Sequence, residues 1–273
     1  MSELKRRRLG RTGLMVPELG LGAMDTPTSP EGGDTLQAAI EAGITFIDTA
    51  REYAGSEMLI GRSLRETEPP ADLCLASKTF SRTANGAQYD IDRSLRALGR
   101  ERIALYQLHD VSTAEAWEAV IGEDGALAGL QAARYRGLIE HIGISSHTAE
   151  IAGLAITSGQ FDTVMLEYSA FYPATASLID LAAEHDVGVI VMRPVGGSGR
   201  TSAMRGRIAE GYGGPLTPAN LLRYVWSNPG VSVAIPGARY PSRIRDNVAT
   251  ASDWLPLDET ERRALEVEAA RLY

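Results

Sequence analysis

The sequence predicts an α/β fold, a (β/α)8 TIM barrel whose floor is closed by an N-terminal β-hairpin. Three observations predict it: short apolar runs alternate with amphipathic stretches eight times, the links between them are short, and no linker divides the chain. A chain of 273 residues suits one such barrel, so we expect a single domain over residues 1–273. The alternative, a doubly wound sheet, needs a Gly-x-Gly-x-x-Gly turn after an early strand, and the sequence has none.

The expected strands are the short apolar runs, at residues 19–24, 44–47, 73–77, 103–108, 138–144, 163–166, 187–192 and 231–235. The expected helices are the amphipathic stretches, at residues 34–42, 56–66, 86–98, 113–134, 148–157, 174–185, 217–227 and 241–251. Thr217 and Pro218 begin one of these helices, because proline is well suited to the first helical position. Asp258 and Glu261 have the spacing of a capping box and begin a final helix.

Two segments that contain glycine complete the pattern. Residues 8–16 precede the first strand and are expected to form a hairpin that turns at residues 11–13 and closes the barrel floor. Residues 196–199 and 211–214 are rich in glycine and follow the seventh strand. We expect them to form the only long flexible stretch, on the active face of the barrel.

The composition argues against several classes of protein. A formal net charge of −8 argues against nucleic-acid binding, which needs a basic face. No apolar run approaches the roughly 18 residues that cross a bilayer, so we expect a soluble, cytoplasmic protein. The one cysteine, Cys74, lies in an apolar run and is expected to be a core residue, without a disulfide or cysteine-ligated metal. No metal site is expected, because no His-x-His pair occurs among the histidines, which are His109, His141, His147 and His185.

Four ionisable side chains follow three neighbouring strands of the expected barrel. Asp48 ends the second strand, and Tyr53 comes five residues later. Lys78 ends the third strand, and His109 ends the fourth. Because the C-terminal ends of barrel strands converge on the active face, we expect all four side chains to meet in one pocket. Each residue alone has an ordinary structural interpretation, as a cap, a surface lysine, an aromatic lid or a hydrogen-bonded histidine, but their joint placement favours a site.

These groups together suit proton transfer to an oxygen atom. A phenol has an ordinary pKa of about 10, and lowering it by about 3 units requires ~4 kcal/mol of differential stabilisation of the phenolate. A neighbouring ammonium would supply much of this, and a carboxylate would hold the ammonium in place. An imidazole would orient a carbonyl oxygen and share the proton transfer. Hydride for the carbonyl carbon must come from a cofactor, since no side chain supplies it.

Around these residues the sequence resembles the aldo-keto reductase family. Residues 43–53, Gly-Ile-Thr-Phe-Ile-Asp-Thr-Ala-Arg-Glu-Tyr, are similar to the family's Asp-Thr-Ala-x-x-Tyr signature. Residues 76–78 and 106–109 match the segments that carry the lysine and the histidine of the catalytic tetrad. The likeness covers residues 9–247, and the motifs occur in the family's order at matching spacing.

The resemblance implies NADPH-dependent reduction of an aldehyde or ketone, with a small-molecule carbonyl or alcohol as the substrate. Tyr53 is then the general acid in reduction and the general base in oxidation. Lys78 and Asp48 lower its pKa, and His109 orients the substrate carbonyl. The physiological substrate and the oligomeric state are left open.

By the same resemblance, the nicotinamide cofactor lies extended across the barrel mouth. The residues expected to contact it are Gly22, Ala23, Asp48, Ser145, Ser146, Met192, Arg193, Gly196, Gly237, Arg239, Arg243, Asp246 and Asn247. Three positions depart from the common pattern of the family. Ser146 replaces an asparagine that holds the carboxamide, Met165 replaces a glutamine, and Met192 replaces an aromatic residue behind the nicotinamide.

The adenosine end of the cofactor determines the expected choice of nucleotide. Arg243 aligns with the arginine that meets the 2′-phosphate, and Arg239 compensates for Gly237, which is lysine in some members. The segment opens a helix, where backbone N–H groups attract anions, and guanidinium groups suit phosphate. A solvated helix face is the alternative interpretation. We expect NADP rather than NAD.

A second functional class uses the same fold. The chain is alternatively a nucleotide-sensing regulatory or interaction module with little turnover, as the potassium-channel β subunits illustrate within the family. The altered positions Ser146 and Met165 favour this alternative. The four intact tetrad residues favour an enzyme.

Overall fold

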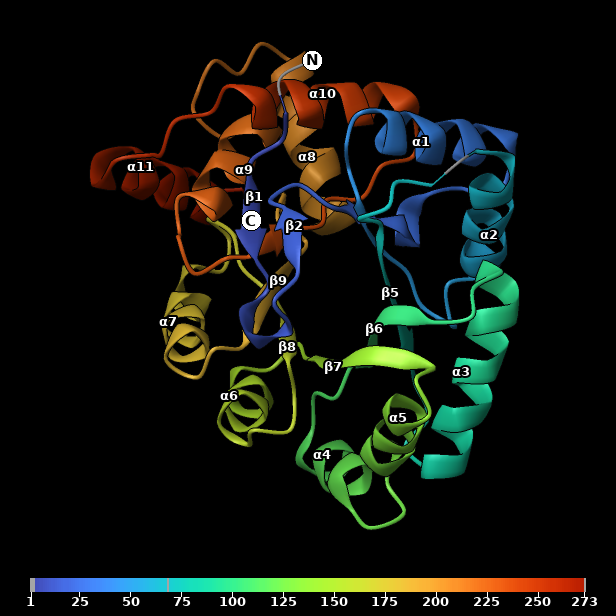
Figure 1. The fold of residues 1–273 in the computed structure, drawn as a ribbon. Helices are drawn as coiled ribbons and strands as arrows, with labels where there is room; N and C mark the ends of the chain where they lie inside the picture. The colour runs from blue at the N-terminus through green and yellow to red at the C-terminus, as the bar shows by residue number, and fades with distance from the viewer. Residues whose placement is uncertain (1–2, 68, 273) are drawn as a thin grey trace.

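The computed structural model describes residues 3–67 and 69–272 and shows parallel strands surrounded by helices (Figure 1). The strands are β1 (Arg6–Arg8), β2 (Met15–Pro17), β3 (Leu21–Gly22), β4 (Phe46–Asp48), β5 (Cys74–Thr79), β6 (Ile103–Leu108), β7 (Ile139–Ser145), β8 (Thr163–Glu167), β9 (Gly188–Met192) and β10 (Val233–Ala234). The α-helices are α1 (Pro30–Glu41), α2 (Ser56–Glu66), α3 (Ala84–Leu98), α4 (Ala114–Ile121), α5 (Ala126–Tyr135), α6 (Ala149–Thr157), α7 (Ala176–Glu184), α8 (Gly197–Ala209), α9 (Pro218–Trp226), α10 (Pro241–Ser252) and α11 (Glu259–Ala270). Strands β3 to β10 form one sheet of eight in chain order, and neighbours pair in parallel. This confirms the predicted (β/α)8 barrel.

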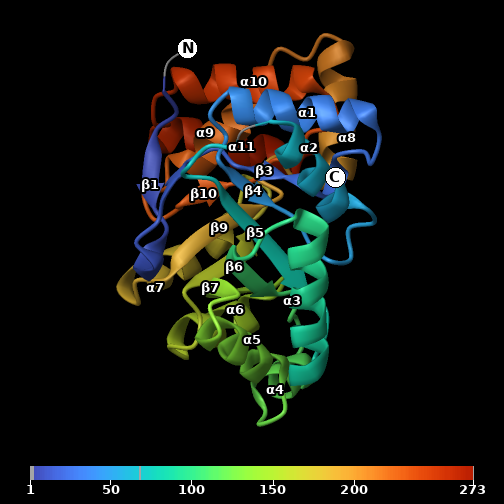
Figure 2. The ribbon, with the colours of Figure 1, turned by 45° about the vertical axis from the view of Figure 1, so that its right-hand side comes forward.

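The sheet closes where β3 meets β10. Leu19 forms a parallel bridge with Ala234, and Gly22 forms another with Gly237. A Cβ atom on Gly22 would lie 2.8 Å from the carbonyl oxygen of Ile235, which is closer than packed atoms approach. Only glycine therefore allows the two backbones to come together at this seam. Around the outside, α10 lies beside α1 in both views (Figure 1 and Figure 2).

The N-terminal hairpin closes the barrel floor, as predicted. Strands β1 and β2 pair antiparallel and are joined through the 3₁₀ turn η1 (Gly10–Thr12). Gly10 has a φ of +51°, and a Cβ atom there would lie 2.1 Å from the amide nitrogen of Gly188, where β9 begins. Leu9 is fully buried and packs in one cluster with Phe46 of β4 and Leu105 of β6. The hairpin therefore covers the N-terminal ends of the strands with an apolar plug.

The apolar core has two parts. A smaller cluster inside the barrel contains Leu9 and side chains from several strands, and a larger one joins the strands to the surrounding helices. Cys74 belongs to the inner cluster and is buried, which confirms its expected place in the core. Burial raises the pKa of the Cys74 thiol to about 12, so the thiol stays protonated at neutral pH.

Two predicted helix starts are confirmed. The hydroxyl of Thr217 accepts a hydrogen bond from the amide of Asn220 at 3.2 Å, and Pro218 is the first helical residue of α9. Asp258 and Glu261 exchange the two hydrogen bonds of a capping box at the start of α11, at 2.8 and 2.9 Å. Within the described part of the chain, no helix is long and apolar enough to cross a membrane.

Two sequence-based expectations were wrong. The single helix expected at residues 113–134 is two helices, because the chain turns at Gly125, where a Cβ atom would lie 2.4 Å from the carbonyl oxygen of Val120. The flexible stretch expected from residue 196 onward is largely helix α8. Met204 of this helix is buried in the core cluster, and this contact orders a sequence with low intrinsic helix propensity.

Candidate active site

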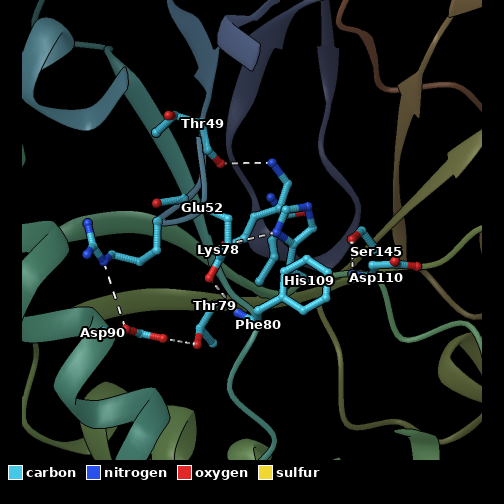
Figure 3. Close-up of polar contacts among 12 residues, drawn as sticks. Thr49, Glu52, Lys78, Thr79, Phe80, Asp90, His109, Asp110 and Ser145 are labelled. Atoms are coloured by element: carbon cyan, nitrogen blue, oxygen red, sulfur yellow. Dashed lines mark hydrogen bonds and ion pairs between the residues drawn. The ribbon is translucent and has the colours of Figure 1, made fainter. Parts of the chain in front are cut away.

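A buried ion pair joins the ends of β4 and β5. The ammonium of Lys78 donates to Oδ2 of Asp48 at 2.6 Å. It also donates to the carbonyl oxygen of Thr49 at 2.8 Å, a contact drawn in Figure 3. Gln107 of β6 donates through Nε2 to Oδ1 of Asp48 at 3.1 Å. Burial raises the pKa of Asp48, while the Lys78 ammonium and the Gln107 amide oppose this shift. Several hydrogen bonds therefore fix the side chains of Lys78 and Asp48, and both side chains are buried.

Tyr53 lies in the loop after β4, directly above this pair. The ammonium of Lys78 is 5.0 Å from the centre of the Tyr53 ring. The ring meets that of His109 edge to face, with 5.5 Å between the ring centres. The loop is held by hydrogen bonds from the Tyr53 amide to Ala50 and from the Ser56 amide to Tyr53, at 3.2 and 2.9 Å. The structure thus brings all four expected tetrad residues together.

The lowered pKa expected for Tyr53 is not found. Burial raises the pKa of Tyr53 well above its ordinary value, the charges of Asp48 and Glu52 add to the shift, and Arg193 opposes it. The expectation failed because the charge of Lys78 is largely taken up by Asp48 at 2.6 Å. The phenol therefore holds its proton at neutral pH.

His109 follows β6 and is fixed by its backbone as well as by its ring. Its amide donates to the carbonyl oxygen of Thr79 at 2.9 Å, and the Arg82 guanidinium donates to the His109 carbonyl at 2.9 Å. The next residue, Asp110, has a φ of +50°, a conformation that non-glycine residues seldom adopt and that concentrates at functional sites. The imidazole is thus held at the rim of the barrel.

Glu52 is a site residue that was not predicted from the sequence. Its Oε2 atom lies 3.1 Å from Nδ1 of His109, and its Oε1 atom accepts from the amide of Phe80 at 3.0 Å. The Phe80 ring packs on the imidazole with 4.7 Å between centres, and Figure 3 shows the three side chains facing one another. The only signal in the sequence was that Glu52 directly precedes Tyr53 in the signature loop.

A second group of charged residues follows β7, β8 and β9. Oε1 of Glu167 lies 2.7 Å from Nδ1 of His147 and accepts from the Arg193 guanidinium at 2.8 Å. Within the described residues, Oε2 of Glu167 is buried without a hydrogen-bond partner. Such a buried acceptor is costly unless it is met by a donor, and an amide NH2 group supplies one. Arg193, with a φ of +51°, is the expected cofactor contact in this group.

The other residues expected near the nicotinamide lie around this group. The Ser145 hydroxyl accepts from the amide of Asp110 at 2.9 Å, and Ser146 is hydrogen-bonded to Thr148 at 3.2 Å. Met192 ends β9 and pairs with Glu167 of β8. Gly196 has a φ of +91° at the start of α8.

The expected contacts on the first strand are placed by the seam of the barrel. Ala23 is buried in the 3₁₀ turn η2 (Ala23–Asp25), and Gly22 and Gly237 form the bridge that closes the sheet. A Cβ atom on Gly237 would lie 2.9 Å from a carboxylate oxygen of Asp25. Close packing at the seam therefore requires glycine at both positions, in addition to the expected contact with the cofactor.

The residues expected to bind the 2′-phosphate lie in α10 and in the segment just before it. Arg243 pairs with Asp246 at 3.2 Å, and Arg239 lies 3.8 Å from Asp25. Arg205 of α8 was not foreseen: burial, and next the charge of Arg243, lowers its pKa. Like charges are thus brought close together, an arrangement that an anion would stabilise.

The last two expected cofactor contacts lie on the same helix. Asp246 and Asn247 are both in α10, where Asp246 is exposed and Asn247 is half-buried. Within residues 3–67 and 69–272, no group of three or more histidine, cysteine, aspartate or glutamate side chains is placed to hold a metal ion.

Comparison with known proteins shows similarity along nearly the whole chain. An aldo-keto reductase from Bacillus halodurans, solved in its holo form, superposes with a TM-score of 0.78 at 24% identity over 99% of this chain and 96% of that one. A putative aldo-keto reductase from Pseudomonas aeruginosa superposes with a TM-score of 0.75 at 28% identity, covering 92% of this chain and 97% of the other.

Similar sequences include enzymes named as oxidoreductases. L-galactose dehydrogenase of Arabidopsis thaliana is 26% identical over 98% of this chain and 95% of its own length. The uncharacterized oxidoreductase YqkF of Bacillus subtilis is 25% identical over 96% of both chains. The family model described as Aldo/keto reductase family matches residues 18–266. The chain therefore belongs to the aldo/keto reductase family and is an oxidoreductase of the carbonyl-reducing type.

Proposed function

We propose that the protein reduces an aldehyde or ketone to the alcohol with NADPH, and that Tyr53 is the proton donor. The observation that carries the proposal is the buried pair of Lys78 and Asp48 below the Tyr53 ring, with His109 at the edge of that ring. When bound, the nicotinamide supplies the hydride for the carbonyl carbon. No other residue of this cluster holds a phenolic proton so close to both a cation and an imidazole.

The raised pKa of Tyr53 keeps the phenol protonated, as a proton donor requires. The phenol keeps its proton through the neutral range and releases it to the substrate oxygen only as that oxygen becomes an alkoxide. The phenolate that remains lies over the Lys78 ammonium, whose positive charge stabilises it. Water then returns the proton to the phenol. The buried surroundings strengthen each of these electrostatic interactions.

Two features support a nicotinamide cofactor and, among these, NADP. The buried oxygen Oε2 of Glu167 suits the amide hydrogens of a carboxamide. Arg205, Arg239 and Arg243 suit an additional phosphate, because guanidinium groups bind phosphate oxygens in a bidentate manner. We propose that these arginines make the protein prefer NADPH to NADH.

The test is a screen that follows NADPH absorbance with aldehydes, ketones and alcohols in both directions. Sugars such as L-galactose belong in the panel, because one similar protein is named for that substrate. Once a substrate is found, Tyr53→Phe is expected to lower kcat at least about a hundredfold while the protein still binds NADPH, since it removes the acid alone. Wild-type turnover in this variant would refute Tyr53 as the donor. Tight NADPH binding without turnover on any carbonyl would favour a regulatory module instead.

A further inference from the structure

A pocket lined by arginines lies between α2 and α3, outside the barrel. Its volume is about 610 Å³, and it is lined by Arg51, Arg62, Arg65, Arg93 and Arg96 together with one carboxylate, Glu57. The chain as a whole carries a net charge of −8, so a concave surface with this excess of positive charge is unusual for it. The two helices are in contact, and α2 lies above the C-terminal end of α3 in the view of Figure 1.

The single carboxylate does not neutralise the pocket. Oε2 of Glu57 accepts from Arg51 at 2.9 Å, and Oε1 accepts from the hydroxyl of Ser77 at 2.6 Å. Glu57 is buried, and its one ion-pair partner in the described part of the chain is Arg51. The other four arginines are therefore left without a carboxylate among the residues that line the pocket.

Among the described residues, those four arginines also have no ion-pair partner outside the pocket. Arg62, Arg65 and Arg96 form no side-chain hydrogen bond or ion pair with any other residue in 3–67 and 69–272. Arg93 makes one cation–π contact, with the Tyr89 ring at 5.9 Å. All four are exposed, so their donors are available to a ligand.

The close approach of the two helices fixes this arrangement. A Cβ atom on Gly61 would lie 2.2 Å from the carbonyl oxygen of Ala97, so α2 touches the backbone of α3 there. Arg62 on one helix and Arg96 on the other directly neighbour this contact point in sequence. On each helix the next arginine is three residues away, about 4.5 Å along the axis, which places cations in pairs along one groove.

We propose that this groove is a binding site for the di- or triphosphate group of a small molecule, separate from the cofactor site. A chain of phosphates carries several negative charges in a row and presents the oxygen pairs that guanidinium forks bind best. One wall is formed by Arg51, Tyr53 and Gly55 of the loop that carries the proposed proton donor. A ligand in the groove therefore contacts the loop that holds the active site.

The test is calorimetric titration of the full-length protein with inorganic tripolyphosphate at low salt. The wild type and the variant Arg136→Gln are expected to bind alike, because Arg136 is also exposed and lies elsewhere, at the end of α5. The double variant Arg62→Gln/Arg96→Gln is expected to bind at least tenfold more weakly, with an unchanged Tm in the absence of the ligand. Equal binding by the double variant, or no binding by the wild type, would overturn the proposal.

Three further arms of the experiment identify the ligand and the site. Arg243→Ala is expected to leave tripolyphosphate binding intact, and its loss would assign the binding to the cofactor site instead. ATP that binds more tightly than tripolyphosphate identifies a nucleotide, whereas equal affinity identifies the phosphate chain alone as the ligand. Orthophosphate or polyglutamate that binds as tightly as tripolyphosphate would contradict recognition of a phosphate chain.

Discussion

Oε2 of Glu52 lies 3.1 Å from Nδ1 of His109, while the other oxygen of the same carboxylate is held by the amide of Phe80 at 3.0 Å. A carboxylate only accepts hydrogen bonds, so Nδ1 of the imidazole must carry the proton in this pair. Burial acts to raise the pKa of Glu52, but the hydrogen bonds from His109 and Phe80 outweigh it and lower that pKa. Glu52 is thus ionised at neutral pH and fixes Nδ1 as the ring nitrogen of His109 that carries the proton.

Replacement of this carboxylate by an amide is expected to change the protonation of His109. In Glu52→Gln the side-chain NH2 group is able to donate to Nδ1, which favours the tautomer with its proton on Nε2. We expect the pH profile of kcat/KM to shift, because both the tautomer of His109 and the negative charge beside it change. Nitrogen NMR of labelled histidine reports the tautomer directly, separately from activity. Glu140→Gln, at a surface carboxylate paired with Arg102, serves as the control.

An unchanged tautomer together with an unchanged pH profile in Glu52→Gln would show that the Glu52 contact only packs the loop. A lower stability with normal kinetics would lead to the same conclusion.

Removal of one partner of the Lys78–Asp48 ion pair is expected to lower the free energy of unfolding strongly. Lys78→Met leaves a buried carboxylate without its cation, which typically lowers the free energy of unfolding by about 3–5 kcal/mol. The double variant Lys78→Met/Asp48→Asn removes the charge as well and is expected to recover much of that loss. Urea unfolding at pH 7 measures both values. Lys5→Met, at the chain's other lysine, removes an exposed ammonium that donates to the Trp254 carbonyl at 3.3 Å, and is expected to cost only about 1 kcal/mol. A loss from Lys78→Met as small as that from Lys5→Met would contradict the argument.

The convergence of the tetrad was predictable because it follows from barrel topology. Asp48, Lys78 and His109 each follow an apolar run, and parallel strands deliver their C-terminal ends to one rim. Glu52 was not predictable, since its direction depends on the hydrogen-bonded turn after β4. The sign of the Tyr53 pKa shift was missed because burial and the pairing of Lys78 are properties of the folded chain.

The helical structure of α8 was also not predictable from the sequence. Its sequence contains Gly197 and Gly199, which favour disorder by intrinsic propensity, and the segment was expected to be flexible. Tertiary burial of Met204 outweighs that preference. Since Arg205 follows directly, its place beside Arg243 was hidden for the same reason.

The preference for NADPH is expected to depend on Arg243. Arg243→Ala removes the guanidinium that we propose binds the 2′-phosphate. Charge-assisted hydrogen bonds contribute about 1.5–3 kcal/mol, so KM for NADPH should rise roughly tenfold to a hundredfold. KM for NADH should change little, because NADH lacks that phosphate. Arg245→Ala on the same helix is the matched control, since Arg245 is exposed. Steady-state kinetics with both nucleotides measures the effect. Equal changes for NADPH and NADH would refute the phosphate assignment.

Glu167 is expected to make stability depend on pH on the acidic side. Burial acts to raise its pKa, but the hydrogen bond with His147 and the charge of Arg193 outweigh it and lower that pKa. Because the folded pKa lies below the unfolded value of about 4.3, the stabilisation is present above that value and is lost as the pH falls through the folded pKa. Glu167→Gln should therefore be less stable than the wild type by about 1 kcal/mol near pH 5, a small value for a half-exposed pair.

The difference between the wild type and Glu167→Gln should shrink as the pH is lowered from about 5 toward 3, where the wild-type carboxylate also becomes neutral. Urea unfolding at several pH values follows the difference. Glu150→Gln, at an exposed carboxylate with no ion pair to another described residue, should show no such trend. A difference for Glu167→Gln that stays constant from pH 5 to 3 would mean that the contact contributes through packing, because a packing contribution does not depend on protonation.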